Sequence, residues 1–484
     1  MRPKQHRLRS AALALAAALA VIAAVVGIII SPLIAAAAIL GAAIFILALA
    51  RPMVFFAIAL SIIVASATLE NLFKGTGVGF ADEAVVLIAL LAFSFRRLAQ
   101  RKTLVFPAGS GWFVAFAAAG IASAAFQDVP AGIAAQGTFL AVKGLLFAFA
   151  AAQLDWANSD LKNLARNGAI GAAVVLSLAA VNLAVPRQWS QLILGYPSVD
   201  YTFILPALIG PFVHPAAFGR VCAIIAVAAF AYRLTVGRTR SSGLLLAAAS
   251  FGGILSFRVK TLVGMFASLG YLRLRHRSAG LLVALFAILP LGILILWVPL
   301  TKFIGADLQA YIFQDSARST ITFGALDVAG GYFPFGAGFG RYGSFIAASN
   351  YSPEYVQRGF QSVYGLGATP GDGNFLTDTQ WPAIVGEAGW LGALFFAIGL
   401  LRVWLSFRRA SGDFDNPIHN WIRLTGAGLF LLFLVESIAA PVYSSAPAYP
   451  FSFLMTGILA SIAASTLSSE TKIRGSHSPA VQQA

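Results

Sequence analysis

Long apolar segments follow one another along most of the chain, and they constrain the fold more than any other feature. About 20 residues of apolar helix cross the hydrocarbon layer of a bilayer. We identify 14 candidate spans, at residues 11–30, 33–50, 52–67, 84–95, 111–126, 138–153, 168–185, 215–233, 242–256, 259–272, 279–298, 381–401, 424–440 and 449–466. These segments lack the period-two alternation of membrane barrel strands, so we expect helices.

The composition indicates that lipid is the main solvent of this chain. Charged residues make up 11% of the sequence and hydrophobic residues 59%, whereas soluble proteins carry about 25% charged residues. So few charges cannot cover a water-facing surface of this size. The expected fold class is therefore an all-α polytopic membrane protein with about 12–14 transmembrane helices.

The spans divide the chain into four parts. Residues 1–298 carry about eleven transmembrane helices, and residues 381–466 form the C-terminal ones. Residues 299–380 form a loop that is too long to be a simple connector and that includes an expected interfacial helix at 306–329. The polar tail, 467–484, is expected to be disordered and cytoplasmic.

The basic residues predict an orientation. The formal net charge is +15, but Lys and Arg gather in alternate connections, as they do at the cytoplasmic ends of spans, which argues against nucleic-acid binding. Of the 33 basic residues, 23 fall on the side of the N-terminus. The N-terminal run reads as an uncleaved first span rather than a signal peptide. We expect a bacterial inner-membrane protein with a cytoplasmic N-terminus and a periplasmic large loop.

Several cations lie where the positive-inside pattern does not explain them. Arg258 is at the outer end of two short spans, Arg220 is near the start of a span, Lys143 is inside one, and Arg318 is in the large loop. Together they are candidates for binding phosphate or pyrophosphate, since guanidinium groups present a fork to phosphate oxygens. The alternative is that they snorkel or pair with acidic residues such as Glu354.

Two carboxylates stand near the end of the large loop. Asp378 is at the membrane entrance and is a candidate general base toward a sugar hydroxyl, while it equally suits the N-cap of the next span. Glu387 is about two turns further along the chain and is a candidate catalytic residue or a buried brace. Before them, the glycines at 336, 338 and 340 resemble a nucleotide loop only superficially, because no buried strand precedes them.

Four of these segments, in this order, resemble the O-antigen ligase and O-antigen polymerase superfamily of bacterial inner-membrane glycosyltransferases. They are residues 210–215 (Gly-Pro-Phe-Val-His-Pro), residues 258–262 (Arg-Val-Lys-Thr-Leu), Arg318 followed by residues 335–340 (Phe-Gly-Ala-Gly-Phe-Gly), and residues 378–392, which end in Glu-Ala-Gly-Trp-Leu-Gly. The likeness covers about residues 135–400.

The resemblance implies a glycosyltransferase C-like membrane fold and a donor saccharide on undecaprenyl pyrophosphate. It implies that the reaction needs no metal, no cofactor and no nucleotide sugar. It also implies that polysaccharide assembly proteins are partners. Arg258 would be the main pyrophosphate contact, helped by Arg220 or Arg318. Ligases of this family carry His where this chain has Asp378, which favours a polymerase for O-antigen, capsule or exopolysaccharide.

Aromatic residues can stack on sugar faces, and the large loop is rich in them. The candidate saccharide-binding residues are His214, Tyr332, Arg341, Tyr342 and Trp381. A different class of function, a transporter or flippase of lipid-linked saccharides, would also need many spans and a cationic cavity. It would predict broken spans in matching halves of the chain, and we find no such repeat.

Overall fold

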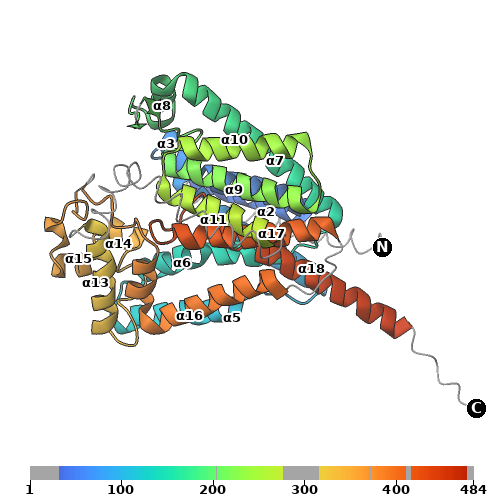
Figure 1. Ribbon diagram of the computed structural model, residues 1–484. Coiled ribbons are helices and arrows are strands. Elements are labelled where there is room, and N and C mark those ends of the chain that lie inside the picture. Colours follow the sequence, from blue (N-terminus) through green and yellow to red (C-terminus); the bar gives the residue numbers. More distant parts are fainter. Residues whose placement is uncertain (1–31, 203, 276–315, 370–371, 410–415, 477–484) are drawn as a thin grey trace, which may run out of the picture.

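The computed structural model describes residues 32–202, 204–275, 316–369, 372–409 and 416–476 (Figure 1). Its elements, in chain order, are α2 (Pro32–Ala50), α3 (Pro52–Leu72), η1 (Val78–Phe80), α4 (Ala81–Ala99), α5 (Ser110–Phe126), α6 (Ala131–Ala152), α7 (Asn158–Ala184), α8 (Pro186–Leu194), β1 (Tyr201–Thr202), β2 (Leu205–Pro206), α9 (Pro215–Thr235), α10 (Arg240–Leu255), α11 (Val259–Arg275), α13 (Ala317–Gly331), α14 (Phe345–Ser349), α15 (Pro353–Gln357), η3 (Phe360–Ser362), α16 (Trp381–Arg409), α17 (Pro417–Glu436) and α18 (Tyr449–Ser476). The two strands form a small antiparallel pair.

The all-α polytopic fold is confirmed. Among the described residues, eight helices are long and apolar enough to cross a membrane. Helices coincide with twelve of the fourteen predicted spans; the other two, 11–30 and 279–298, lie outside the described residues. The main shift is in α17, which begins at Pro417 rather than 424. There the Asn416 side chain accepts a hydrogen bond from the Ile418 N–H, and an N-cap followed by proline starts a helix regardless of hydropathy.

Pairs of helices distant in sequence hold the bundle together. α5 packs along α16, α6 along α18, and α17 against α9 and α11; Figure 1 shows α5 and α16 running side by side. In the α6–α18 pair, a Cβ at Gly457 would lie 2.1 Å from the Ala148 carbonyl oxygen. Helix association in lipid depends on such close backbone approach, so a larger residue at 457 would push α18 away from α6.

The segment between α13 and α16 forms a small compact unit at one end of the bundle, where α13, α14 and α15 gather (Figure 1). Its core includes Tyr342, Tyr355 and Phe360. The Tyr342 and Tyr355 rings meet edge to face with centroids 5.6 Å apart, a favourable aromatic geometry. We call the end of the bundle beside residues 316–380 the loop end.

Two sequence expectations concern segments that are only partly described. The helix expected at 306–329 corresponds to α13, which runs to Gly331; residues 306–315 lie outside the described residues. The tail was expected to be disordered from 467, whereas α18 continues to Ser476. Ser, Glu, Thr and Lys can extend a helix beyond its apolar part at small cost.

Candidate functional site

Charged side chains from six segments of the chain meet at the loop end. These segments are the α8–α9 connection, α9, the α10–α11 turn with the start of α11, α13, the residues before α16, and the end of α17. We call the group the loop-end cluster; its members are Asp200, His214, Arg220, Arg258, Lys260, Arg318, Asp378 and Glu436. Four cations face three carboxylates, so the cluster keeps a positive charge when its histidine is neutral.

Asp378 is the carboxylate that connects two of these cations. Its Oδ2 pairs with Nη2 of Arg318, and its Oδ1 lies 3.8 Å from Nζ of Lys260. The Arg318 guanidinium also lies over the Phe375 ring, 4.9 Å from its centroid, a cation–π contact. The Asp378 side chain is 23% exposed. Two cations therefore hold the carboxylate in place while it stays accessible to solvent.

Arg258 lies in the tight turn between α10 and α11. The preceding residue, Phe257, has a φ of 50°, a backbone conformation that bulky residues rarely adopt. Nη2 of Arg258 is 2.9 Å from Oδ2 of Asp200, and the arginine side chain is 32% exposed. Its Nε is buried with no hydrogen-bond partner among the described residues. The exposed part of the Arg258 guanidinium can therefore contact an incoming anion.

Arg220 and Glu436 form the buried side of the cluster. Nε of Arg220 is 2.6 Å from Oε2 of Glu436, and the two side chains are 6% and 0% exposed. Lys260 lies within electrostatic range of both residues, and its Nζ also donates to the Ala439 carbonyl oxygen. A buried ion pair loses much stability when one partner is removed. Both arginines have a carboxylate partner, but the Arg220 pair is buried, whereas the Arg258 side chain is 32% exposed.

His214 is the N-cap of α9, and its Nδ1 accepts a hydrogen bond from the Ala216 N–H at 3.1 Å. Partial burial and, to a smaller extent, the positive charges of Arg258 and Lys260 together lower the pKa of His214 to about 4. The imidazole is therefore neutral at physiological pH. Because Nδ1 accepts, the proton resides on Nε2, which can donate to a ligand oxygen.

Lys143 pairs with a different set of residues. Its Nζ lies 2.9 Å from Oδ2 of Asp82 and 2.8 Å from Oε1 of Glu83. The same Nζ is 4.7 Å from the ring centroid of Tyr449, whose hydroxyl donates to Asp82. We call these four residues the Lys143 cluster. Two carboxylates explain why a lysine is tolerated in a span, and no contact among the described residues joins Lys143 to the loop-end cluster.

Glu387 lies outside the loop-end cluster. Its side chain is 2% exposed, and Oε1 accepts from the backbone N–H groups of Gly340 and Tyr342 at 2.9 and 3.1 Å and from the Ser344 hydroxyl at 2.6 Å. A carboxylate that accepts several such bonds fixes the backbone around it. The contacts match the brace interpretation rather than the catalytic one: Glu387 fastens the large loop to α16.

The glycine-rich segment 336–340 packs against a break in α16. Gly389 has φ 70° and ψ −171°, so the helix is interrupted there and leaves carbonyl groups open. The Gly386 carbonyl oxygen accepts from the Ala337 N–H at 2.8 Å. A Cβ at Gly389 would lie 2.1 Å from the Phe335 carbonyl group. These glycines therefore permit close backbone contact, which positions the residues that follow in the loop.

The predicted saccharide-binding residues of the large loop and α16 differ in their exposure and contacts. Tyr342 is fully buried and donates to the Ile321 carbonyl oxygen, which corrects its assignment as a sugar-stacking residue. Trp381 is half-buried, and its Nε1 donates to the Ser437 hydroxyl. The Tyr332 hydroxyl donates to Glu354, which also pairs with Arg358. Nε of Arg341 is buried without a partner among the described residues. The strongly exposed aromatics of this unit are Phe323, Phe333, Phe345 and Tyr364.

Sequence reasoning missed three members of the loop-end cluster. Lys260 lies two residues after Arg258, inside the motif 258–262, and that position was a usable signal. Asp200 and Glu436 carry no local signal: Asp200 is 58 residues from Arg258, and Glu436 is 216 residues from Arg220. Only the folded chain shows that these carboxylates are the partners of the two arginines.

No family model and no curated protein sequence matches this chain. Among the described residues, no group of three or more His, Cys, Asp or Glu side chains is placed to hold a metal ion. Fold and site together therefore define a class: a polytopic α-helical membrane protein with a mixed, net positive ion cluster beside a folded loop.

Proposed function

We propose that this protein is a membrane glycosyltransferase that polymerises, or ligates, oligosaccharide units carried on undecaprenyl pyrophosphate. The loop-end cluster is the observation that carries this proposal. It combines accessible cations suited to a diphosphate with a carboxylate suited to activate a hydroxyl. The sequence likeness to the O-antigen ligase and polymerase superfamily falls on residues 258–262, Arg318 and Asp378, which are part of this cluster.

The diphosphate of the donor would bind at Arg258, because that guanidinium is partly exposed beside the other cations of the cluster. Lys260 and the Nε2–H of His214 would supply further donors. The lipid diphosphate is the leaving group, and its negative charge grows as the bond to the anomeric carbon breaks. Cations placed beside this charge lower the barrier to transfer. Arg220, paired with Glu436, would support Lys260 from the buried side.

Asp378 would act as the general base. It would take the proton from the acceptor hydroxyl as that oxygen bonds to the anomeric carbon and the carbon–oxygen bond to the diphosphate breaks. Its contacts with Arg318 and Lys260 fix the carboxylate beside the cations. The acceptor would be a second lipid-linked repeat unit in a polymerase. The large loop, facing the periplasm of a bacterial inner membrane, would hold the growing glycan.

A transporter or flippase of lipid-linked saccharides is the second candidate. Ionisable residues inside spans often mark a transport path, and the Lys143 cluster places three of them in α4 and α6. These charges are paired with one another. At the break in α16, backbone carbonyl groups accept hydrogen bonds from the large loop, so they are not open to a transported ion or substrate. Both features favour the enzyme over the carrier.

The test is glycan chain extension in cells that depend on this protein. Arg258→Ala is expected to abolish extension while the protein remains in the membrane at normal abundance. Arg187→Ala is the matched control, since Arg187 is exposed on the neighbouring helix α8 and has no ion pair among those found in the described residues. Normal chain length with Arg258→Ala would remove Arg258 from the site.

A further inference from the structure

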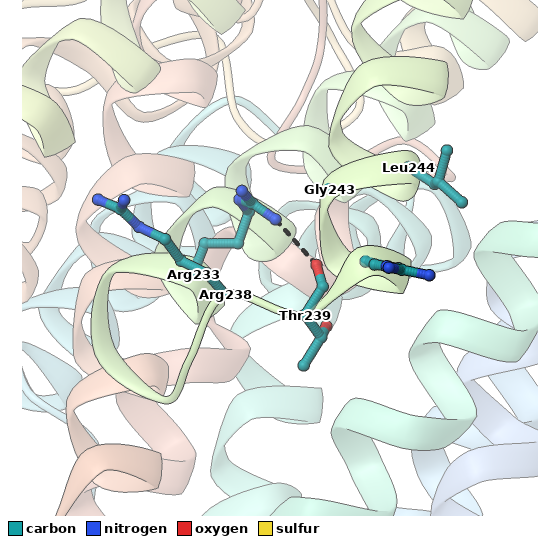
Figure 2. Close-up of a pocket in the computed structure, with 6 residues that line it drawn as sticks. Arg233, Arg238, Thr239, Gly243 and Leu244 are labelled. Carbon is teal, nitrogen blue, oxygen red and sulfur yellow. Dashed lines mark hydrogen bonds between the residues drawn. The ribbon is translucent and has the colours of Figure 1, made fainter.

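A second basic site lies where α9 turns into α10, at the other end of α9 from His214 and Arg220 (Figure 2). An open surface depression of about 470 Å³ lies there; its lining residues are Arg233, Arg238, Thr239, Arg240, Gly243 and Leu244. Half of these residues are arginines, and none is acidic. The positive-inside pattern explains why these arginines lie just beyond a span. It does not require three of them to line the same depression.

The local geometry holds one of these guanidinium groups over the start of α10. Nη1 of Arg233 donates to the Thr239 carbonyl oxygen at 3.0 Å (Figure 2) and to the Ser242 hydroxyl at 3.3 Å. Gly243 makes room for it, because a Cβ there would lie 2.7 Å from the same Nη1. Thr239 caps the helix, so the positive end of the helix dipole adds to the arginine charges.

The arginines of this depression lack acidic partners. Among the ion pairs of the described residues, none involves Arg233, Arg238 or Arg240. The loop-end cluster differs, because there each carboxylate contacts a cation. Three positive charges and a helix N-terminus, with no carboxylate paired to them among the described residues, favour binding of an external anion.

An apolar stripe begins at the edge of the depression and follows α10. Its members are the exposed residues Leu244, Ala247, Ala248, Phe251 and Ile254. They recur at intervals of three and four residues, which places them on one face of the helix. Leu244, in the wall of the depression, is 71% exposed. The basic depression and the apolar stripe together are complementary to a molecule with an anionic head and an apolar tail.

We infer that this depression binds the phosphate headgroup of an anionic glycerophospholipid, with an acyl chain lying along the α10 stripe. Basic pockets between helices at the cytoplasmic surface bind such headgroups in other membrane proteins. The inference uses none of the residues proposed for glycosyl transfer, so it stands or falls independently of that function.

The experiment measures lipid retained by the purified full-length protein in native mass spectrometry. Phosphatidylglycerol is compared with phosphatidylcholine of the same acyl chains, and an excess of inorganic phosphate is the competitor. Phosphatidylglycerol is expected to be retained at least tenfold better, since each nearby basic residue adds roughly fivefold. Phosphate is expected not to displace it, because phosphate lacks the acyl chain.

Two variants locate the site. Arg238→Gln with Arg240→Gln is expected to lower phosphatidylglycerol binding by more than tenfold; both residues are exposed, so the fold is retained. Arg402→Gln with Arg408→Gln removes the same charge from exposed positions of α16 and is expected to change binding less than twofold. Gly243→Ala, which displaces the Arg233 guanidinium, is expected to have an intermediate effect.

Equal retention of the two lipids, or equal loss in the two arginine pairs, would overturn the inference. Displacement by inorganic phosphate would show a free-anion site and would overturn the assignment to a lipid.

Discussion

The two ion clusters of this protein contain similar side chains but differ in their surroundings. The loop-end cluster draws on six segments and keeps Arg258, Lys260 and Asp378 between 23% and 32% exposed. In the Lys143 cluster, the Lys143 and Asp82 side chains are each 6% exposed and that of Glu83 is 20% exposed. All members belong to the helices α4, α6 and α18.

The difference separates a site from a brace. A charge inside the bundle must be compensated, and the Lys143 ammonium, which contacts two carboxylates, has little left for a ligand. Among the described residues, the loop-end cluster has one more cation than carboxylates, and the Arg258 side chain is 32% exposed. Among sequence-predicted cations, accessibility rather than charge therefore identifies those that can bind a substrate.

The largest effect is expected for Asp378→Asn. Removing a general base typically costs a factor of about 100 to 10,000 in rate, whereas donor binding should not weaken because the cations remain. Turnover of purified protein with a lipid-linked repeat unit measures both quantities. Asp372→Asn, in an exposed part of the same loop, is the control. A turnover within threefold of the original protein would exclude Asp378 as the base.

Lys143→Met tests the other side of the comparison. It leaves Asp82 and Glu83 without their cation, and breaking a buried ion pair in this way costs about 3–5 kcal/mol. We expect a lower thermal unfolding midpoint in detergent, with transfer activity per folded molecule retained. If activity disappears while the midpoint is unchanged, Lys143 belongs with the substrate site and the distinction drawn between the clusters is wrong.

Glu387→Gln tests the brace role of Glu387. The amide oxygen can still accept from Gly340, Tyr342 and Ser344, but the bonds lose their charge assistance, at a cost of about 1–3 kcal/mol. A modest fall of the unfolding midpoint with turnover preserved is expected. Loss of turnover without any loss of stability would restore Glu387 as a catalytic residue.

The smallest effect is expected from His214. Its pKa in the fold is about 4, below the 6.5 of an unfolded chain. The unfolded state therefore gains a proton first as the pH falls, and stability present above pH 6.5 is lost between pH 6.5 and 4. The His214 side chain is exposed, so solvent screening reduces this pH-dependent loss of stability.

His214→Asn keeps an N-cap side chain and cannot titrate in this range. Comparing unfolding midpoints at pH 7 and pH 5 should show a larger fall for the original protein than for the variant. Equal falls would mean that His214 titrates normally, outside the field of Arg258 and Lys260.

The helices could be predicted from the sequence because hydropathy acts locally. Apolar runs that end at proline or glycine correspond closely to α2, α5 and α9. The same rule fails at α17. His419 and Arg423 lie in its first two turns after Pro417, and their polarity predicts a loop there instead of a helix.

The candidate site was only partly predictable. Arg258, Arg318 and Asp378 stood out because ions beside apolar segments are costly. The partner carboxylates Asp200 and Glu436 could not be inferred, since their pairing depends on how distant helices pack. Hydrogen bonds between side chains and distant backbone could not be predicted either. Nothing in the sequence around Glu387 indicates that it accepts from the backbone N–H groups of Gly340 and Tyr342.

The most direct test of the central proposal uses purified protein in proteoliposomes loaded with an undecaprenyl-pyrophosphate-linked repeat unit. Glycans are separated by length, and the lipid carrier is assayed in each leaflet. The original protein is expected to form polymer and release undecaprenyl pyrophosphate, whereas Arg258→Ala is expected to do neither while remaining folded. Movement of the lipid-linked unit across the bilayer with no polymer formed would contradict it and identify a flippase instead.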